Sequence, residues 1–219
     1  MSRSRPPRAA TPRPRATAAR PTSSERRALL DVASRVLATE GPTALSMRRL
    51  ATEAGVSTMV LYTRFGSRDA LMEQLLLEGF TRFGAELAAV SERDPFEQLA
   101  ALGHAYRRFA RQNPTYFPLM WAARQVRRAG EALPAKVPSP ALQQASQRSF
   151  GALAQTVTRV LAALDRPARD VEPLALSVWA TVHGFVSLEM AGVISPAAAD
   201  GAYAQTLAFI EHGFRHAST

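Results

Sequence analysis

The chain has 219 residues, a formal net charge of +9 and no cysteine. A chain of this length buries a core that needs no disulfide or metal, and the lack of cysteine excludes thiolate catalysis, cysteine-bound zinc and thiol redox switching. The longest uncharged stretch, residues 173–188, is shorter than the roughly 20 residues that span a bilayer, and no apolar run follows the basic N-terminus. We therefore expect a cytoplasmic protein without membrane contact.

Most of the excess positive charge lies in residues 1–21, which hold six arginines, five prolines and no acidic residue. A segment without large apolar residues after Met1 cannot bury a core, so it is predicted to be a disordered basic arm. Residues 22–219 carry 21 basic and 18 acidic groups, a net charge of only +3. Two interpretations of the arm stay open: it follows DNA phosphates, or it is a solvated tail.

The first predicted elements after the arm are three helices. A capping-box pattern opens a helix at Thr22, and a Gly-Pro pair ends it. Ser46 is the expected cap of a second, short helix that ends before Gly55, where a left-handed backbone costs little. Ser57 is the expected cap of a third helix through Phe65. Two short helices joined at a glycine predict a helix-turn-helix, whose second helix fits the major groove of DNA.

The helix-turn-helix is the predicted DNA-binding surface. Hydroxyl and N–H groups at the start of its second helix can meet phosphates, and Arg64 is the expected base reader or phosphate clamp. Two arginines in its first helix are expected to hold the flanking backbone. The alternative is an ordinary αα-hairpin without a DNA role. The residues predicted from spacing to contact DNA are Arg48, Arg49, Ser57, Thr58, Met59, Thr63 and Arg64.

Four short motifs occur together in this region. They are Leu45-Ser-Met-Arg-Arg-Leu-Ala51, Ala54-Gly-Val-Ser57, Leu61-Tyr-Thr-Arg-Phe65 and Ser67-Arg-Asp-Ala-Leu71. The joint pattern resembles the N-terminal domain of the tetracycline-repressor (TetR) family, and the resemblance covers about residues 22–90. It implies that Tyr62 and Arg68 contact phosphates, with Arg68 replacing the commoner lysine and keeping its charge. The alternative for Tyr62 is a packed core tyrosine.

Apolar residues at helical spacing predict further helices through the rest of the chain. The clearest internal loop is expected at residues 127–140. The predicted fold class is all-α: a three-helix DNA-binding domain at residues 22–68, and a larger helical ligand-binding and dimerisation domain at residues 69–219. The expected helices begin after Ser67 and then cover residues 95–113, 115–126, 140–164, 171–192 and 198–216.

The C-terminal half contains a second resemblance. The segment from Trp179 through His183-Gly184 to Glu189 is similar to the Trp-His-Gly type of TetR-family C-terminal domain. A pocket is expected among its helices, and its few polar groups favour an apolar or aromatic small molecule. The alternative is that these side chains form plain core. The predicted pocket walls are Phe117, Met120, Trp121, Gln125, Phe150, Val157, Trp179 and His183.

The last two predicted helices are apolar nearly all round, so each is expected to be covered on two sides. Two such helices from each of two protomers make a four-helix interface with two-fold symmetry. The alternative is that both helices are central to one monomeric core. The predicted dimer-interface residues are Leu174, Val178, Phe185, Tyr203, Leu207, Ile210 and Phe214.

These patterns predict a dimeric regulator, most simply a repressor that a small effector releases from a palindromic DNA operator. No metal site, cofactor or enzymatic activity is expected, because no hydrolase, P-loop or dinucleotide motif occurs and His212 with His216 lacks further ligands. Two other classes remain open. One is a small all-helical enzyme or carrier that uses the aromatic pocket, and the other is an architectural DNA protein that relies on the arm.

Overall fold

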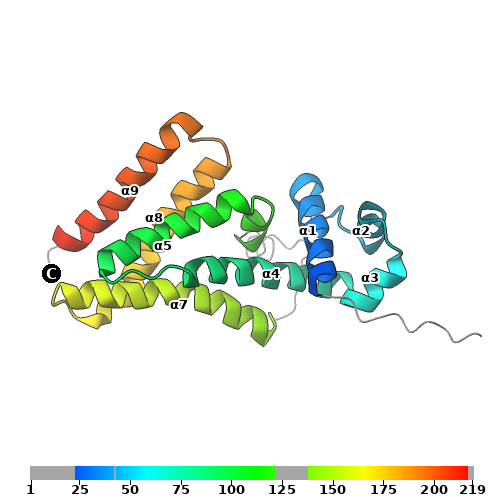
Figure 1. Cartoon of the computed structure of the whole chain (residues 1–219), viewed down its shortest axis with the longest axis horizontal. Helices are drawn as coiled ribbons and strands as arrows, with labels where there is room; N and C mark the ends of the chain where they lie inside the picture. The colour runs from blue at the N-terminus through cyan, green and yellow to red at the C-terminus, as the bar shows by residue number, and fades with distance from the viewer. Residues whose placement is uncertain (1–22, 42, 122–137, 217–219) are drawn as a thin grey trace, which may run out of the picture.

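The computed structural model describes residues 23–41, 43–121 and 138–216, and within these ranges all regular secondary structure is helical (Figure 1). The predicted all-α class is therefore confirmed. The predicted basic arm and most of the predicted loop at 127–140 lie outside the described residues. The elements are α1 (Ser23–Glu40), α2 (Met47–Ala54), α3 (Thr58–Phe65), α4 (Arg68–Ala88), α5 (Pro95–Gln112), α7 (Pro140–Ala163), the 3-10 turn η1 (Ala168–Asp170), α8 (Val171–Met190) and α9 (Pro196–His216).

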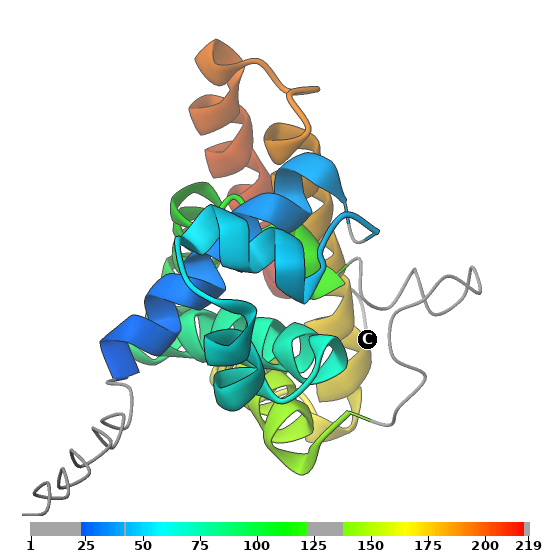
Figure 2. The ribbon, with the colours of Figure 1, turned by 90° about the vertical axis from the view of Figure 1, so that its right-hand side faces the viewer.

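The caps predicted for the short helices are present. The Ser46 side chain accepts a hydrogen bond from Arg49 N at the start of α2, and the Ser57 side chain accepts one from Val60 N at the start of α3. Gly55 ends α2 with a φ of 65°, a left-handed conformation that glycine adopts without a Cβ clash. Figure 2 views the molecule from the end that carries α2 and α3.

A first hydrophobic cluster joins α1, α2, α3 and the beginning of α4. Leu50 and Leu61 are fully buried at its centre, and small Ala51 lets α2 approach its neighbours. Tyr116 also belongs to this cluster, although it comes from a short helical segment at residues 116–121 between α5 and α7. The cluster is therefore closed by a residue from the C-terminal half of the chain.

Helix α4 is shared between the two halves of the molecule (Figure 1). Its first turns bury Leu71 and Leu75 in the first cluster, and its later turns bury Phe80 and Phe83 in a second cluster with α5, residues 116–121 and α8. A third cluster links α5, α7, α8 and the end of α9. The predicted domain boundary at residue 68 stays a prediction, because α4 contributes to both halves.

Helix α9 is attached to the rest of the chain mainly near its two ends. In its first half, the Tyr203 hydroxyl donates a hydrogen bond to the carbonyl of Gly103 in α5. The two helices approach closely there, because a Cβ added at Gly103 would lie only 2.7 Å from Leu207 Cδ2. At its other end, Phe214 is buried in the third cluster. Arg107 secures the α8–α9 hairpin, because its guanidinium donates to both Glu189 carboxylate oxygens at 2.7 Å and also to Asp200 of α9.

One segment of the described chain, Ala168–Met190, is long and apolar enough to cross a membrane by length and composition alone, with a mean hydropathy of 1.3. Core helices of water-soluble proteins pass the same test, and α8 packs against α5, α7 and α9. In the most apolar 18-residue stretch of this segment, however, only 22% is buried inside the protein. Apolar positions such as Leu176 and Leu188 remain about half exposed.

Candidate functional site

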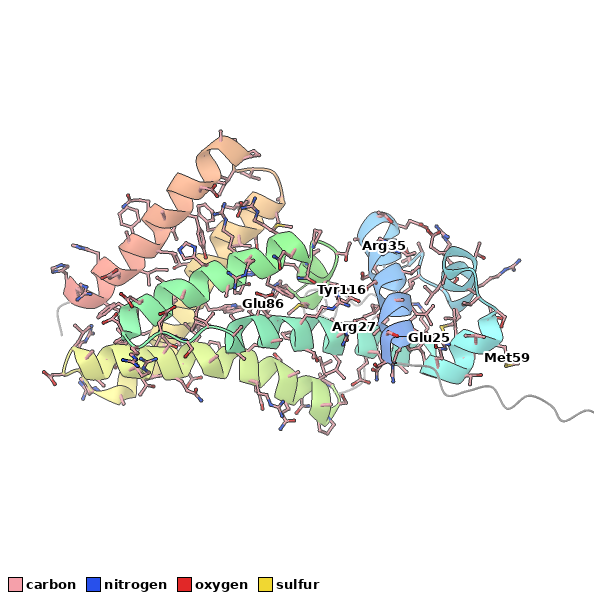
Figure 3. The ribbon with its side chains drawn as sticks, in the orientation of Figure 1. Glu25, Arg27, Arg35, Met59, Glu86 and Tyr116 are labelled. Carbon is pink, nitrogen blue, oxygen red and sulfur yellow. The ribbon has the colours of Figure 1, made fainter. Side chains whose placement is uncertain are left out.

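The exposed side of α3 carries two large apolar residues. Met59 is 72% exposed and Tyr62 is 52% exposed, and Met59 lies at the end of the molecule farthest from α9 (Figure 3). Thr58 and Thr63 are exposed on the same helix. The interpretation of Tyr62 as a packed core residue is therefore wrong. An exposed aromatic ring on a capped recognition helix is available for contact with a phosphate or a base edge.

The structure corrects the predicted position of Arg64. This side chain is only 19% exposed, and its Nη2 lies 3.2 Å from the Glu25 carboxylate of α1. The physical reason is that the last turn of α3 packs toward α1, where Arg26 lies over the Phe65 ring at 5.7 Å. Arg64 is therefore less exposed than Met59 and Thr63, and its guanidinium is in contact with a carboxylate of α1.

The other predicted basic contacts differ in their surroundings. Arg48 is exposed at the start of α2. Arg49 is held by two carboxylates, with 2.6 Å to Glu40 and 2.7 Å to Glu53, and its hydrogen bond lowers the pKa of Glu40. Arg68 donates from Nε to the Leu45 carbonyl at 2.7 Å. Arg68 thereby connects the start of α4 to the segment before α2.

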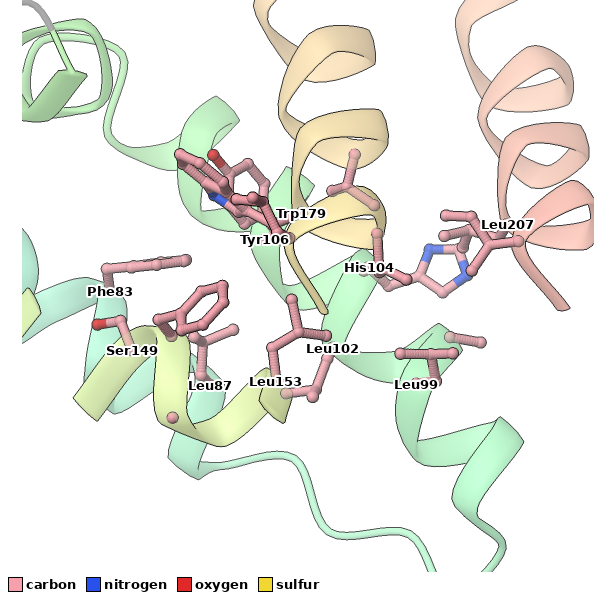
Figure 4. A pocket seen from close by; sticks show the side chains of 18 of the residues that line it. Phe83, Leu87, Leu99, Leu102, His104, Tyr106, Ser149, Leu153, Trp179 and Leu207 are labelled. Carbon is pink, nitrogen blue, oxygen red and sulfur yellow. The ribbon is translucent and has the colours of Figure 1, made fainter. Parts of the chain in front are cut away.

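A cavity of about 850 Å³ lies in the C-terminal half (Figure 4). Helices α4, α5, α7, α8 and α9 all contribute to its walls, and Trp121 comes from the short segment at residues 116–121. The lining is mostly apolar and includes seven aromatic side chains. These aromatic residues are Phe80, Phe83, Phe96, Tyr106, Trp121, Phe150 and Trp179.

Three of the predicted pocket walls line this cavity, namely Trp121, Phe150 and Trp179. Four others do not, and this part of the prediction is corrected. Helical periodicity cannot separate a side chain that faces a cavity from one that faces packed core, so the predicted set of pocket walls contains core positions as well. Gln125 lies outside the described residues. The four predicted walls absent from the cavity lining are Phe117, Met120, Val157 and His183.

His183 lies behind the cavity wall. Its ring stacks on Trp179 with centroids 5.5 Å apart, and its Nδ1 is 2.7 Å from the Tyr106 hydroxyl. Burial lowers the pKa of His183, and its Nδ1 and the Tyr106 hydroxyl share a hydrogen bond. The other nitrogen, Nε2, lies 3.4 Å from Ser187 Oγ. His183 therefore positions Tyr106 and Trp179 in the cavity wall.

Several residues that line the cavity are not identified as such by any sequence pattern. Helix α5 provides Leu99 and His104, and the middle of α9 provides Ala208 and Glu211. Each belongs to an amphipathic helix that fits a packed core equally well. The middle turns of α9 belong to the cavity wall, and Leu207 and Ile210 there also pack against the hydrophobic clusters.

The structure places most of the predicted dimer-interface residues inside the chain or at the cavity. Val178, Tyr203 and Phe214 are buried within the chain, so they are unavailable to a second copy. Leu207 and Ile210 line the cavity. The remaining two, Leu174 and Phe185, pack against the hydrophobic clusters of their own chain. The exposed apolar residues on this hairpin are instead Leu176, Leu188, Val193 and Phe209.

A polar network connects the cavity region to α1, and Figure 3 labels Tyr116, one of its members. The buried Tyr116 hydroxyl donates to Asp31 of α1 at 3.0 Å. Arg82 of α4 also donates to Asp31, at 2.7 Å, and its guanidinium lies 4.6 Å from the centre of the Tyr116 ring. Ser34 and the neighbouring Thr115 are hydrogen-bonded at 2.9 Å. Trp121 of the cavity wall is only five residues along the chain from Tyr116.

Several solved structures have the same fold. A protein from Rhodococcus sp. RHA1 is 28% identical, with a TM-score of 0.72 over 91% of this chain and 98% of that one. The transcriptional regulator FadR from Bacillus subtilis, solved with stearoyl-CoA, is 14% identical, with a TM-score of 0.66 over 84% of this chain and 97% of that one. At 14% identity the likeness to FadR concerns the fold alone.

Sequence comparisons agree with the structural ones. The chain is 29% identical over 90 residues to YobS, an HTH-type transcriptional regulator of Bacillus subtilis (strain 168); the match spans 41% of this chain and 47%, about half, of that relative. Residues 29–75 match the model of bacterial regulatory proteins of the tetR family, and residues 99–210 match that of the tetracyclin repressor-like C-terminal domain. The finer Trp-His-Gly resemblance stays a prediction. The chain belongs to the TetR family of DNA-binding transcriptional regulators, which are not enzymes.

Proposed function

We propose that this chain is a homodimeric repressor that acts in the cytoplasm, binds a palindromic operator through α3, and releases it when a small apolar or aromatic molecule fills the cavity. The proposal keeps residues 22–68 as the DNA-binding part and residues 69–219 as the sensing and dimerising part. One observation carries it: the segment at residues 116–121 touches the cavity through Trp121 and α1 through Tyr116.

The exposed side of α3 supports the DNA contact. Met59, Tyr62 and Thr63 are exposed together with the helix start at Ser57 and Thr58. Backbone N–H groups and hydroxyls at a helix N-terminus favour phosphate, and the side chains beyond them reach base edges in the major groove. Arg48 and Arg68 add positive charge on either side of α3. Arg49 and Arg64 also lie near α3, in contact with the carboxylates of Glu40, Glu53 and Glu25.

The proposed DNA contact is tested with the chain's own upstream intergenic DNA. We expect that DNA to bind at least about a thousandfold more tightly than random sequence at physiological salt. Tyr62→Ala removes an exposed ring that stabilises no core, so it lowers the affinity about tenfold or more without changing the melting temperature. Gln155→Ala, at an exposed position on α7, is the matched control. Equal affinity for upstream and random DNA contradicts the proposal.

The exposed side of the α8–α9 hairpin supports a dimer. Ala180, Gly184 and Leu188 follow one another at four-residue spacing and are all exposed, whereas Leu176, one turn before them, is exposed but lines the cavity. A Cβ at Gly184 would meet no heavy atom within 4 Å, which leaves room for a second helix to approach. Because an isologous interface uses the same patch on both copies, this stripe and Phe209 of α9 are the proposed contact. They replace the face expected from the sequence.

Sedimentation or light scattering tests the proposed dimer. Leu188→Glu and Phe209→Glu place a charge in the proposed interface, so each is expected to shift the chain from dimer toward monomer. Gln155→Glu is the control because it adds the same charge on α7. If neither interface change affects the dimer, the interface lies elsewhere on the chain. If the wild-type protein is a monomer, the proposed dimer is wrong.

The network around Tyr116 supports coupling between the cavity and DNA. A ligand that shifts Trp121 shifts the same short segment that donates to Asp31 and packs beneath Arg82. Coupling is reciprocal, so operator DNA must weaken ligand binding by the same factor by which the ligand weakens DNA binding. Titrating each ligand at saturating concentrations of the other measures both factors. A factor of one would contradict a ligand-released repressor, and agreement between the two factors checks that both titrations reached equilibrium.

A further inference from the structure

The charged groups in the cavity wall are of one sign. Among the described lining residues there are two glutamates, Glu172 and Glu211, and no lysine or arginine. The other polar members are His104, Ser146, Gln147 and Ser149. An anionic ligand would therefore find no countercharge among these side chains, and its transfer from water would be unfavourable. The wall composition favours a ligand that is neutral or positively charged.

The two glutamates are not equivalent. Glu211 on α9 is 2.8 Å from Arg215 one turn away, and that guanidinium lies over the Phe96 ring at 3.9 Å. Glu172 in the first turn of α8 forms no ion pair or hydrogen bond with the residues that the structure describes. Its structural role is limited to a favourable interaction with the N-terminal end of the helix dipole. Glu172 is therefore the carboxylate available to a ligand.

The aromatic side chains also favour positive charge. Trp121 and Trp179, whose ring centroids are 5.4 Å apart, line the cavity together with Phe150. Faces of tryptophan rings attract ammonium groups electrostatically, and the attraction increases when the cation is desolvated. Arg215, which does not itself line the cavity, lies between the Phe96 ring and the Glu211 carboxylate and is an example of this arrangement within the same chain.

We propose that the cavity binds a hydrophobic cation, an amine or quaternary ammonium with an aliphatic or aromatic body, and that Glu172 is its counter-ion. The body occupies the apolar space beside Trp121 and Trp179, and the ammonium group lies toward the start of α8. This inference deepens the proposed effector function and rests on it. It assigns the chemical class of the ligand, which the cavity volume alone does not.

Three probes with the same ten-carbon body test the proposal: decyltrimethylammonium, decanol and decanoate, each below its micelle concentration. Both tryptophans of the chain line the cavity, so tryptophan emission reports directly on its occupancy. Measurements on the full-length protein at about pH 8 keep histidine neutral. We expect the cation to bind about tenfold more tightly than decanol, and decanoate to bind most weakly.

Two matched variants locate the charge. Glu172→Gln is expected to weaken binding of the cation about fivefold and to leave decanol unchanged, because only a charge is removed. Glu211→Gln is expected to leave both affinities within about twofold, because Arg215 already neutralises that carboxylate. Melting temperatures of both variants check that α8 and α9 remain folded.

Several outcomes would overturn the proposal: no binding of the cation, decanol or decanoate binding as tightly as the cation, or equal effects of the two glutamate variants. Operator affinity measured in the same samples separates this failure from failure of the repressor function. If decanol or decanoate binds best and also releases DNA, the ligand class is wrong but the ligand-released repressor stands. If the chain binds no operator at all, the proposed function itself is wrong.

Discussion

The two halves of the molecule differ in how tightly their helices are packed. Around α2 and α3, the side chains of Leu50, Leu61 and Leu71 are completely buried in one small cluster. In the C-terminal half, α4, α5, α7, α8 and α9 surround a cavity of about 850 Å³, and α9 is attached mainly near its ends. The DNA-binding part is therefore built for a fixed shape, whereas the C-terminal half has space that a ligand can fill.

The largest expected effect concerns the ion pairs that hold the α8–α9 hairpin. Arg107→Ala leaves Glu189, whose side chain is 12% exposed, without its bidentate partner. A buried carboxylate without its cation costs about 3 kcal/mol or more. Chemical denaturation followed by tryptophan fluorescence measures the free energy of unfolding.

Arg108→Ala is the control for Arg107, because Arg108 is 47% exposed and pairs with Glu86 at the surface. A surface ion pair contributes at most about 1 kcal/mol. If Arg107→Ala changes the free energy of unfolding no more than Arg108→Ala does, the hairpin does not depend on this network.

A matched pair of leucine truncations tests the difference in packing directly. Leu50→Ala in the first cluster is expected to lower the free energy of unfolding by about 3 kcal/mol, because it opens a cavity in a fully packed core. Leu207→Ala enlarges a cavity that already exists, so the expected loss is only about 1 kcal/mol. Far-UV circular dichroism during denaturation measures both. Equal losses would mean that the two halves are packed alike.

The polar connection between the halves has a smaller expected effect. Tyr116→Phe removes the hydrogen bond to Asp31 but keeps the ring under Arg82, so we expect a loss of about 1 kcal/mol in the free energy of unfolding. Tyr62→Phe, on the exposed side of α3, is expected to change stability by less than about 0.5 kcal/mol. If Tyr116→Phe leaves the free energy of unfolding unchanged, the hydrogen bond to Asp31 contributes nothing to the stability of this junction.

The smallest expected effect is a pH dependence confined to the C-terminal half. The folded-state pKa of His183 lies below its ordinary value because of burial. Between that pKa and about 6.5 the unfolded chain binds more protons, so the free energy of unfolding falls as the pH falls through this window. The midpoint of unfolding, measured at intervals from about pH 7.5 to about pH 5, follows this change in stability. His183→Gln is expected to flatten the profile.

Sequence patterns predicted the helix-turn-helix well because its signals are local. Ser46, Gly55 and Ser57 each define a helix end by their own backbone or side-chain chemistry. The contact of Arg64 with Glu25 has no such local signal, because the two residues are 39 positions apart and no local pattern specifies which end of α1 meets α3.

The C-terminal half was predicted less completely for a different reason. Apolar stripes on α8 and α9 face three kinds of neighbour: packed core, cavity and open surface. Helical periodicity identifies a stripe such as Tyr203, Leu207 and Ile210 but not what covers it. In the structure Tyr203 is buried, whereas Leu207 and Ile210 line the cavity. Tertiary placement of α9, which the sequence does not encode locally, makes the difference.

A hydroxyl-radical footprint on the upstream DNA tests the central claim most directly, because it reports operator contact and two-fold symmetry at once. We expect two protected half-sites about one helical turn, roughly 10 base pairs, apart, both lost in Tyr62→Ala. A single unpaired protected site would contradict the dimeric arrangement. Protection that persists in Tyr62→Ala, or none above random DNA, would contradict binding through the exposed side of α3.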